Sequence, residues 1–85
     1  MDNHSARSYY SHQRKLELLR NYLAVLKEYG DEARYTSRAR MYEKAAERSN
    51  FSPGTARTYL TQMAKNGTQI SSLDEEDLEL FKRNS

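Results

Sequence analysis

The sequence predicts an all-α protein that forms a single domain of about four helices. Leucines recur at intervals of three and four residues in the first third of the chain, which places them on one helix face. Residues that start and stop helices divide the remainder into short segments. No stretch alternates apolar and polar residues as a half-buried strand does. With 85 residues, the chain has room for one domain only.

The first predicted helix spans residues 13–29 and follows a polar, flexible lead over residues 1–12, so that residues 13–85 form the domain. Gly30 is well suited to end this helix, and residues 31–34 are predicted to form a short polar connector. The spacing allows two interpretations of the apolar stripe, as the core face of one chain or as the seam of a homodimer, because coiled coils use the same spacing. The stripe consists of Leu16, Leu19, Leu23 and Leu26.

Two shorter helices are predicted over residues 37–49 and 53–65. A hydroxyl at Thr36 or Ser37 can accept a free N–H of the first of them. Ser52 followed by Pro53 is an N-cap followed by an N1 proline, which is a strong start signal for the second.

The connection between these two helices and their apolar faces are also predicted. Asn50 tolerates the left-handed conformation that ends a helix, and Asn66-Gly67 is expected to stop the second helix. We expect Tyr42 and Tyr59 to belong to the core rather than to stack on bases. The apolar stripe of the second helix is Ala56, Tyr59, Leu60 and Met63.

The last predicted helix spans residues 72–82 and is acidic. Ser72 and Glu75 fit a capping box, and the carboxylates of residues 74–77 suit the positive end of a helix dipole. Three roles are open for this helix: a solvated cap on the core, a contact with a protein partner, or a fold-back onto basic residues that lowers affinity for DNA.

Charge is distributed unevenly along the chain. Residues 34–65 hold seven basic and two acidic side chains, whereas residues 66–85 hold two basic and five acidic ones. A basic middle segment favours a negatively charged partner.

Other function classes lack the residues they need. There is no cysteine, and the two histidines, His4 and His12, have no orienting partner nearby in the sequence. Three glycines are too few for a phosphate-binding loop, and no apolar run is long enough to cross a membrane. We therefore expect no enzyme, no cofactor, no metal site and a cytoplasmic location.

Residues 37–65 resemble a helix-turn-helix. Ala46 matches the small residue where the two helices approach closely, and Phe51 matches the apolar residue after the turn. Ala56 and Tyr59 match inward positions of the second helix. The stretch is similar to the corresponding halves of bacterial and phage repressors and of site-specific recombinases.

Three residues depart from the motif, and no wing is expected. Asn50 replaces the commoner glycine, Ser49 stands where an apolar residue is usual, and Ala56 is smaller than the usual valine or isoleucine. The segment 67–71 is too short for a hairpin.

The resemblance implies that the helix over residues 53–65 enters the major groove of DNA. Arg57 is the best base reader, because a guanidinium can bond guanine O6 and N7 together. Implied base-reading residues are Ser52, Gly54, Arg57, Thr58, Thr61 and Gln62. Implied phosphate contacts are Arg38, Arg40, Lys44, Arg48 and Lys65.

The resulting hypothesis is a small transcriptional regulator that binds double-stranded DNA as a homodimer, like small phage or plasmid regulators. The dimer contact is expected to involve the first helix, the acidic last helix or both. One alternative is a helical protein-interaction module, such as an adaptor or inhibitor, that does not bind nucleic acid. The other is a DNA-binding component of a recombination or packaging complex.

Overall fold

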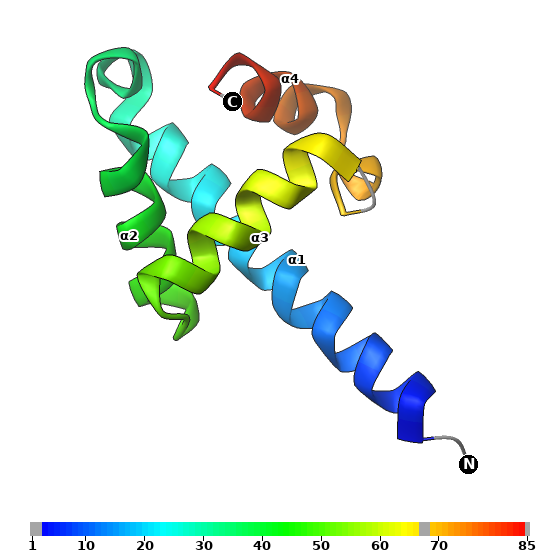
Figure 1. Ribbon diagram of the computed structural model, residues 1–85. Coiled ribbons are helices and arrows are strands. Elements are labelled where there is room, and N and C mark those ends of the chain that lie inside the picture. The colour runs from blue at the N-terminus through cyan, green and yellow to red at the C-terminus, as the bar shows by residue number, and fades with distance from the viewer. Residues whose placement is uncertain (1–2, 67–68, 85) are drawn as a thin grey trace.

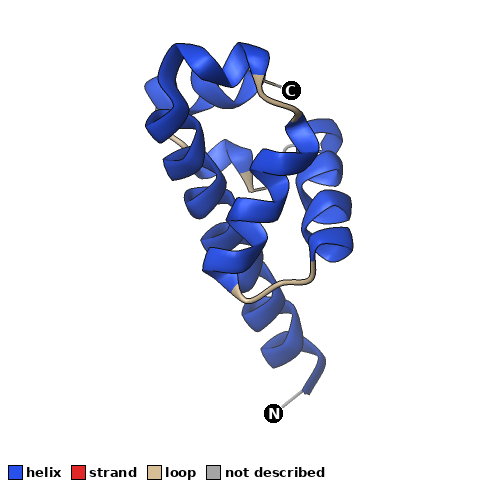
Figure 2. Ribbon diagram, turned by 90° about the vertical axis from the view of Figure 1, so that its left-hand side faces the viewer, coloured by secondary structure: helices blue, strands red, loops and turns tan. Residues whose placement is uncertain are grey.

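The structure is a computed structural model that describes the backbone of residues 3–66 and 69–84 and the side chains of residues 11–65 and 69–84. No strand occurs in these ranges (Figure 2), which confirms the all-α fold class. In chain order the elements are α1 (Asn3–Tyr29), the 3₁₀ helix η1 (Gly30–Tyr35), α2 (Arg38–Ser49), α3 (Pro53–Asn66), the 3₁₀ helix η2 (Ile70–Ser72) and α4 (Glu75–Arg83) (Figure 1).

α1 is the helix against which the other three α-helices pack. It contacts η1, α2, α3 and α4, and its first turns extend beyond the rest of the molecule (Figure 1). The four leucines of its stripe are 8% exposed or less within a single chain. The stripe is thus the core face of α1, and its interpretation as a homodimer seam is wrong for this structure.

α1 begins ten residues earlier than the sequence indicated, at Asn3 rather than near residue 13. The predicted lead over residues 1–12 is therefore helical from Asn3 onward, and Met1 and Asp2 lie outside the described residues. Residues 3–12 contain no glycine or proline, so nothing in them interrupts a helix that the apolar residues further along have already started.

The caps of α2 and α3 are as predicted. The Oγ of Ser37 accepts a hydrogen bond from the N–H of Arg40 at 3.2 Å, and the Oγ of Ser52 accepts one from the N–H of Thr55 at the same distance. Asn50 ends α2 in the left-handed conformation, with φ 57° and ψ 38°. α3 ends at Asn66, and Gly67 is not among the described residues.

The start of α4 and the connection after α1 differ from the prediction. The N-cap is Asp74, whose Oδ1 accepts the N–H of Asp77 at 2.8 Å, so the capping box of Ser72 and Glu75 does not form. Ser72 instead closes the turn η2 by donating to the carbonyl of Gln69 at 2.7 Å. A carboxylate interacts more strongly with a helix N-terminus than a hydroxyl does, which explains the choice of Asp74. The connector predicted over residues 31–34 lies within η1.

Tyr22 joins three helices at the centre of the core. Its ring lies 5.3 Å from the ring of Tyr42 on α2 and 6.0 Å, edge-on, from that of Phe81 on α4. Burial raises the pKa of the Tyr22 hydroxyl, and the neighbouring Tyr42 raises it further. No helix in the described part of the chain has the length and apolar character needed to cross a membrane.

Candidate nucleic-acid interface

α3 has a buried face and an exposed face, as its residue spacing predicts. Ala56, Leu60 and Met63 are 0%, 1% and 2% exposed and face the core. Gly54, Arg57, Thr58, Thr61, Gln62 and Lys65, here named the α3 stripe, are all exposed. These positions recur at three- and four-residue intervals, so they share one side of the helix. The five predicted base readers from Gly54 to Gln62 are therefore brought together with Lys65.

Two hydroxyls at this surface already have local partners. The hydroxyl of Ser52 caps α3 and donates to the Oγ1 of Thr55 at 2.8 Å. The hydroxyl of Thr58 donates to the carbonyl of Gly54 at 3.0 Å. Each of these hydroxyl oxygens can still accept a hydrogen bond, but its proton is already donated to a neighbouring group. Arg57 and Gln62 are therefore the side chains of the α3 stripe that are better able to donate hydrogen bonds to DNA than Ser52 or Thr58.

A groove of about 500 Å³ separates α2 from α3, and we name it the α2–α3 groove. It brings Arg38 of α2 together with Arg57 and Thr61 of the α3 stripe, and Ala39 and Tyr42 complete its lining. Because Tyr42 also packs against Tyr22, its ring serves as a wall joined to the core. The groove thus places a predicted phosphate contact beside the predicted guanine reader.

The other predicted phosphate contacts are spread over the surface. Lys44 lies over the ring of Tyr29 at 5.3 Å, and Arg48 forms an ion pair with Glu28, so both face α1. The hydrogen bond from Arg48 holds the pKa of the Glu28 carboxyl below its ordinary value. Arg40 and Lys65 are exposed, and no ion pair involves either of them in the described part of the structure.

Two basic residues near the turn between α2 and α3 were not predicted from the sequence. The guanidinium of Arg14 donates to the carbonyl of Ser49 at 2.8 Å and lies 4.6 Å from the ring centre of Phe51. The ammonium of Lys15 lies 4.7 Å from the ring centre of Tyr59 on α3. Both residues fall in a first third of the chain with balanced charge, and only the packing of α1 reveals that they lie beside the turn.

Ser49 is buried at 0% exposure, and its hydroxyl both donates and accepts a hydrogen bond. It donates to the carbonyl of Ala45 at 2.8 Å and accepts from the Nδ2 of Asn21 at 2.7 Å. The departure from the apolar residue usual at this position is therefore compensated by hydrogen bonds, which a buried polar group requires.

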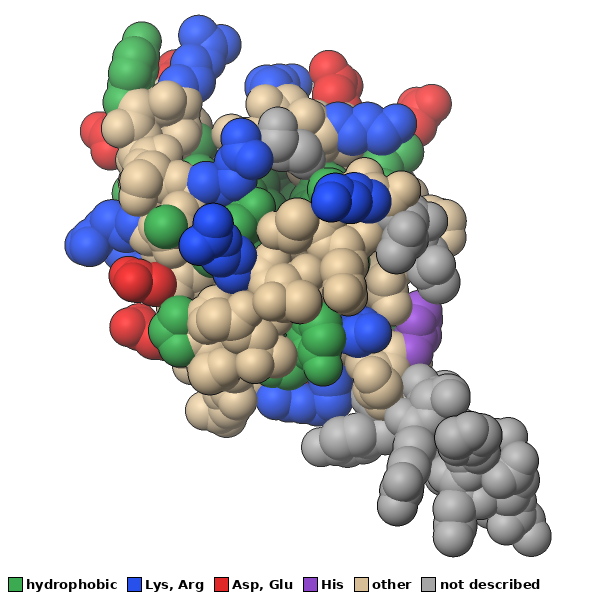
Figure 3. Space-filling model, in the orientation of Figure 1, with side chains coloured by type: hydrophobic (Ala, Val, Ile, Leu, Met, Phe, Trp, Pro, Cys, Tyr) green, Lys and Arg blue, Asp and Glu red, His purple; other side chains and the backbone are tan. Residues whose placement is uncertain are grey.

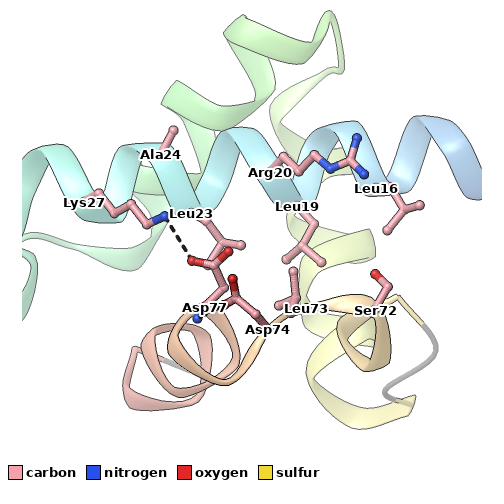
Figure 4. Close-up of a pocket in the computed structure, with 10 residues that line it drawn as sticks. All are labelled: Leu16, Leu19, Arg20, Leu23, Ala24, Lys27, Ser72, Leu73, Asp74 and Asp77. Carbon is pink, nitrogen blue, oxygen red and sulfur yellow. Dashed lines mark hydrogen bonds and ion pairs between the residues drawn. The ribbon is translucent and has the colours of Figure 1, made fainter.

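α4 lies against α1, with its acidic first turn on the side of Lys27. Asp77 accepts from Lys27 at 3.0 Å, and this contact raises the pKa of the Lys27 ammonium. A second groove, of about 430 Å³, runs between α1 and the segment from η2 to α4, with Arg20 on its rim (Figure 4). Phe81, at 3% exposure, anchors α4 in the core. The helix is thus a cap on the core in this structure.

Lys and Arg side chains occupy the middle of the face that α2 and α3 present, and Asp and Glu side chains appear towards its edges (Figure 3). Among the described residues, no group of three His, Asp or Glu side chains is arranged to hold a metal ion. No protein-family model matches the chain, and comparison with curated proteins and with solved structures also gives no match.

Proposed function

We propose that this protein binds double-stranded DNA in a sequence-specific manner and acts as a small transcriptional regulator. The observation that carries the proposal is the position of Arg57, which projects from the exposed α3 stripe and shares the α2–α3 groove with Arg38. An α-helix fits the major groove of B-form DNA, and arginine is the commonest reader of guanine there.

In this proposal α3 enters the major groove with its N-terminal half foremost. Arg57 bonds a guanine, Gln62 bonds an adenine, and Thr58 and Thr61 contact thymine methyl groups or phosphates. The N–H of Gly54, near the helix N-terminus, binds a phosphate oxygen. Gly54 has no side chain, and the space that a Cβ would occupy is open. The DNA backbone can therefore approach α3 closely at this position.

The proposed regulator acts as a homodimer on two half-sites about one helical turn apart. The leucine stripe of α1 is not available for this dimer, since it is buried within one chain. The exposed acidic side of α4, which includes Glu75 and Glu76, is the remaining surface from the sequence hypothesis.

The test is a titration of fluorescent mixed-sequence duplex with the protein at about 50 and 200 mM salt, followed by selection of a preferred site. Wild-type binding should weaken steeply at the higher salt. Arg57→Ala should lose about 1–3 kcal/mol of binding free energy on the selected site, and it should distinguish less well between bases at one position of that site.

Arg20→Ala is the matched control, because it removes the same charge from the groove beside α4. It should retain the wild-type preference. Absence of binding at the lower salt would exclude the proposed function and favour the protein-interaction module. Equal binding of the selected site by Arg57→Ala and wild type would exclude α3 as the reading helix.

A further inference from the structure

We infer that the DNA-binding surface continues past α3 to the C-terminal end of α4, where Arg34 and Arg83 hold phosphates of the same backbone that Arg38 contacts. This inference rests on the proposed function and deepens it. It assigns a binding role to two arginines outside the residues that the helix-turn-helix resemblance implies.

The structure contains a third groove, of about 420 Å³, between η1, the start of α2 and the end of α4. Arg34, Arg38 and Arg83 line it together with Thr36 and Asn84, and its apolar lining is Ala33 and Met41. Three arginines from three different elements therefore line one groove. We name it the arginine groove.

The arginine groove adjoins the α2–α3 groove, because Arg38 lines both of them. The ribbon shows the same order in space: the C-terminal end of α4 points towards η1 and the start of α2, and α3 crosses below (Figure 1). The cationic side chains thus follow a path from Arg83 and Arg34 through Arg38 to Arg57.

Acidic side chains do little to neutralise this path. Arg34, Arg38 and Arg57 take part in no ion pair within the described residues. Arg83 pairs with Glu79 at 3.4 Å, and their side chains are 61% and 74% exposed. An exposed pair of this kind is weak, so a phosphate can replace Glu79 as the partner of Arg83.

Arginines that line one groove repel one another, and an anion bound between them offsets that repulsion. A phosphate suits the guanidinium fork, which binds its oxygens in pairs. The N-terminus of α2, capped by Ser37, adds the positive end of its dipole at the same place. Successive phosphates of one DNA strand supply anions at several points along such a path, which a single small anion does not.

The experiment compares Arg34→Ala and Arg83→Ala with the controls Arg20→Ala and Lys82→Ala, using the full chain and a duplex of about two helical turns. Each groove variant should reduce the slope of log K against log salt by about 0.9, which corresponds to about an eightfold loss of affinity at 0.1 M salt. The loss should be the same on selected and mixed sequence. The controls should stay close to wild type.

Glu79→Gln provides a second measurement in the opposite direction. It frees Arg83 and removes a carboxylate beside the arginine groove, so affinity should increase. Glu76→Gln makes the same charge change on the exposed first turn of α4 and should increase affinity less.

Failure of this inference can be distinguished from failure of the proposed function. Groove variants that match their controls, in a protein whose binding is weakened by Arg57→Ala, would overturn this inference and leave the proposed function intact. A wild-type protein that binds no duplex would overturn both. All six substituted positions of the groove and control variants are exposed, and thermal unfolding followed by circular dichroism checks that each variant is folded.

Discussion

Asn21 donates a hydrogen bond of 2.7 Å to the hydroxyl of Ser49 and so connects the middle of α1 to the last residue of α2. The hydroxyl of Ser49 in turn donates a hydrogen bond to the carbonyl of Ala45, one turn earlier. Arg14 binds the carbonyl of Ser49 from the same side of α1. These bonds hold the turn before α3 in a fixed position relative to α1.

Ser49→Ala should destabilise the protein by about 1–3 kcal/mol, because it leaves the amide of Asn21 without its partner in a partly buried place. Urea unfolding measures the loss. The double variant Asn21→Ala/Ser49→Ala should lose less than the sum of the two single variants. Additive losses would show that the hydrogen bond does not couple the two helices.

Asn50→Ala should cost about 1 kcal/mol, because Asn50 has a positive φ that alanine adopts only with strain. Asn50→Gly should keep or slightly raise the stability, since glycine adopts this conformation freely. Thermal unfolding of the two variants separates the backbone effect from loss of the side chain. A glycine variant as unstable as the alanine variant would contradict this explanation.

Phe81→Ala should cost about 3–5 kcal/mol, because it removes a buried ring that packs on Tyr22. A loss of this size is a large fraction of the stability of a small domain. Denaturant unfolding measures it, and Lys82→Ala, at the exposed neighbouring position, serves as control. A change of less than about 1 kcal/mol would mean that α4 does not depend on this anchor.

The Glu28–Arg48 pair should make stability depend on pH on the acid side. The hydrogen bond from Arg48 lowers the pKa of Glu28 in the folded state below its ordinary value of 4.5. The unfolded chain therefore binds more protons in that window, and stability rises with pH across it. The contribution of this pair to the free energy of unfolding is fully present above pH 4.5, and it is lost as the pH falls through the lowered pKa of Glu28.

Glu28→Gln should accordingly flatten the acid side of the stability profile, measured by urea unfolding across a pH series. Glu32→Gln is the control, since Glu32 is exposed and no ion pair within the described ranges includes it. Parallel profiles for Glu28→Gln and wild type would show that the pair makes no contribution in solution.

Arg38→Ala should reduce the salt dependence of DNA binding by about one unit of slope, whereas Arg48→Ala should change it less. Arg38 lies between two grooves without an acidic partner, and Arg48 is already held by Glu28. Both residues belong to the phosphate contacts expected from the sequence. Equal effects would mean that the DNA approaches the side of α2 that faces α1.

The parts of the fold that were predicted from sequence depend on neighbouring residues. Ser37, Asn50 and Ser52-Pro53 act on the backbone within a few positions of themselves, and the structure contains all these caps. The start of α4 was misplaced because Ser72 and Asp74 both satisfy the local pattern, and only their hydrogen bonds distinguish them.

The candidate site was predicted in part for a related reason. The α3 stripe follows from helical periodicity, so its exposure was accessible from sequence. The arginine groove is lined by Arg34 and Arg83, which are 49 residues apart in the sequence. Arg14 likewise bonds to Ser49, which is 35 residues away. No local pattern encodes such meetings, because they arise from how separate helices pack.

The central position of α1 also bears on how the chain folds during synthesis. α1, which contacts η1, α2, α3 and α4, is synthesised before all of them. Each new segment leaving the ribosome thus finds its packing surface already present, so a growing chain can fold progressively as its C-terminal parts emerge. Phe81 lies in the last turn of α4, so the ring of Tyr22 stays uncovered by it until that turn is complete.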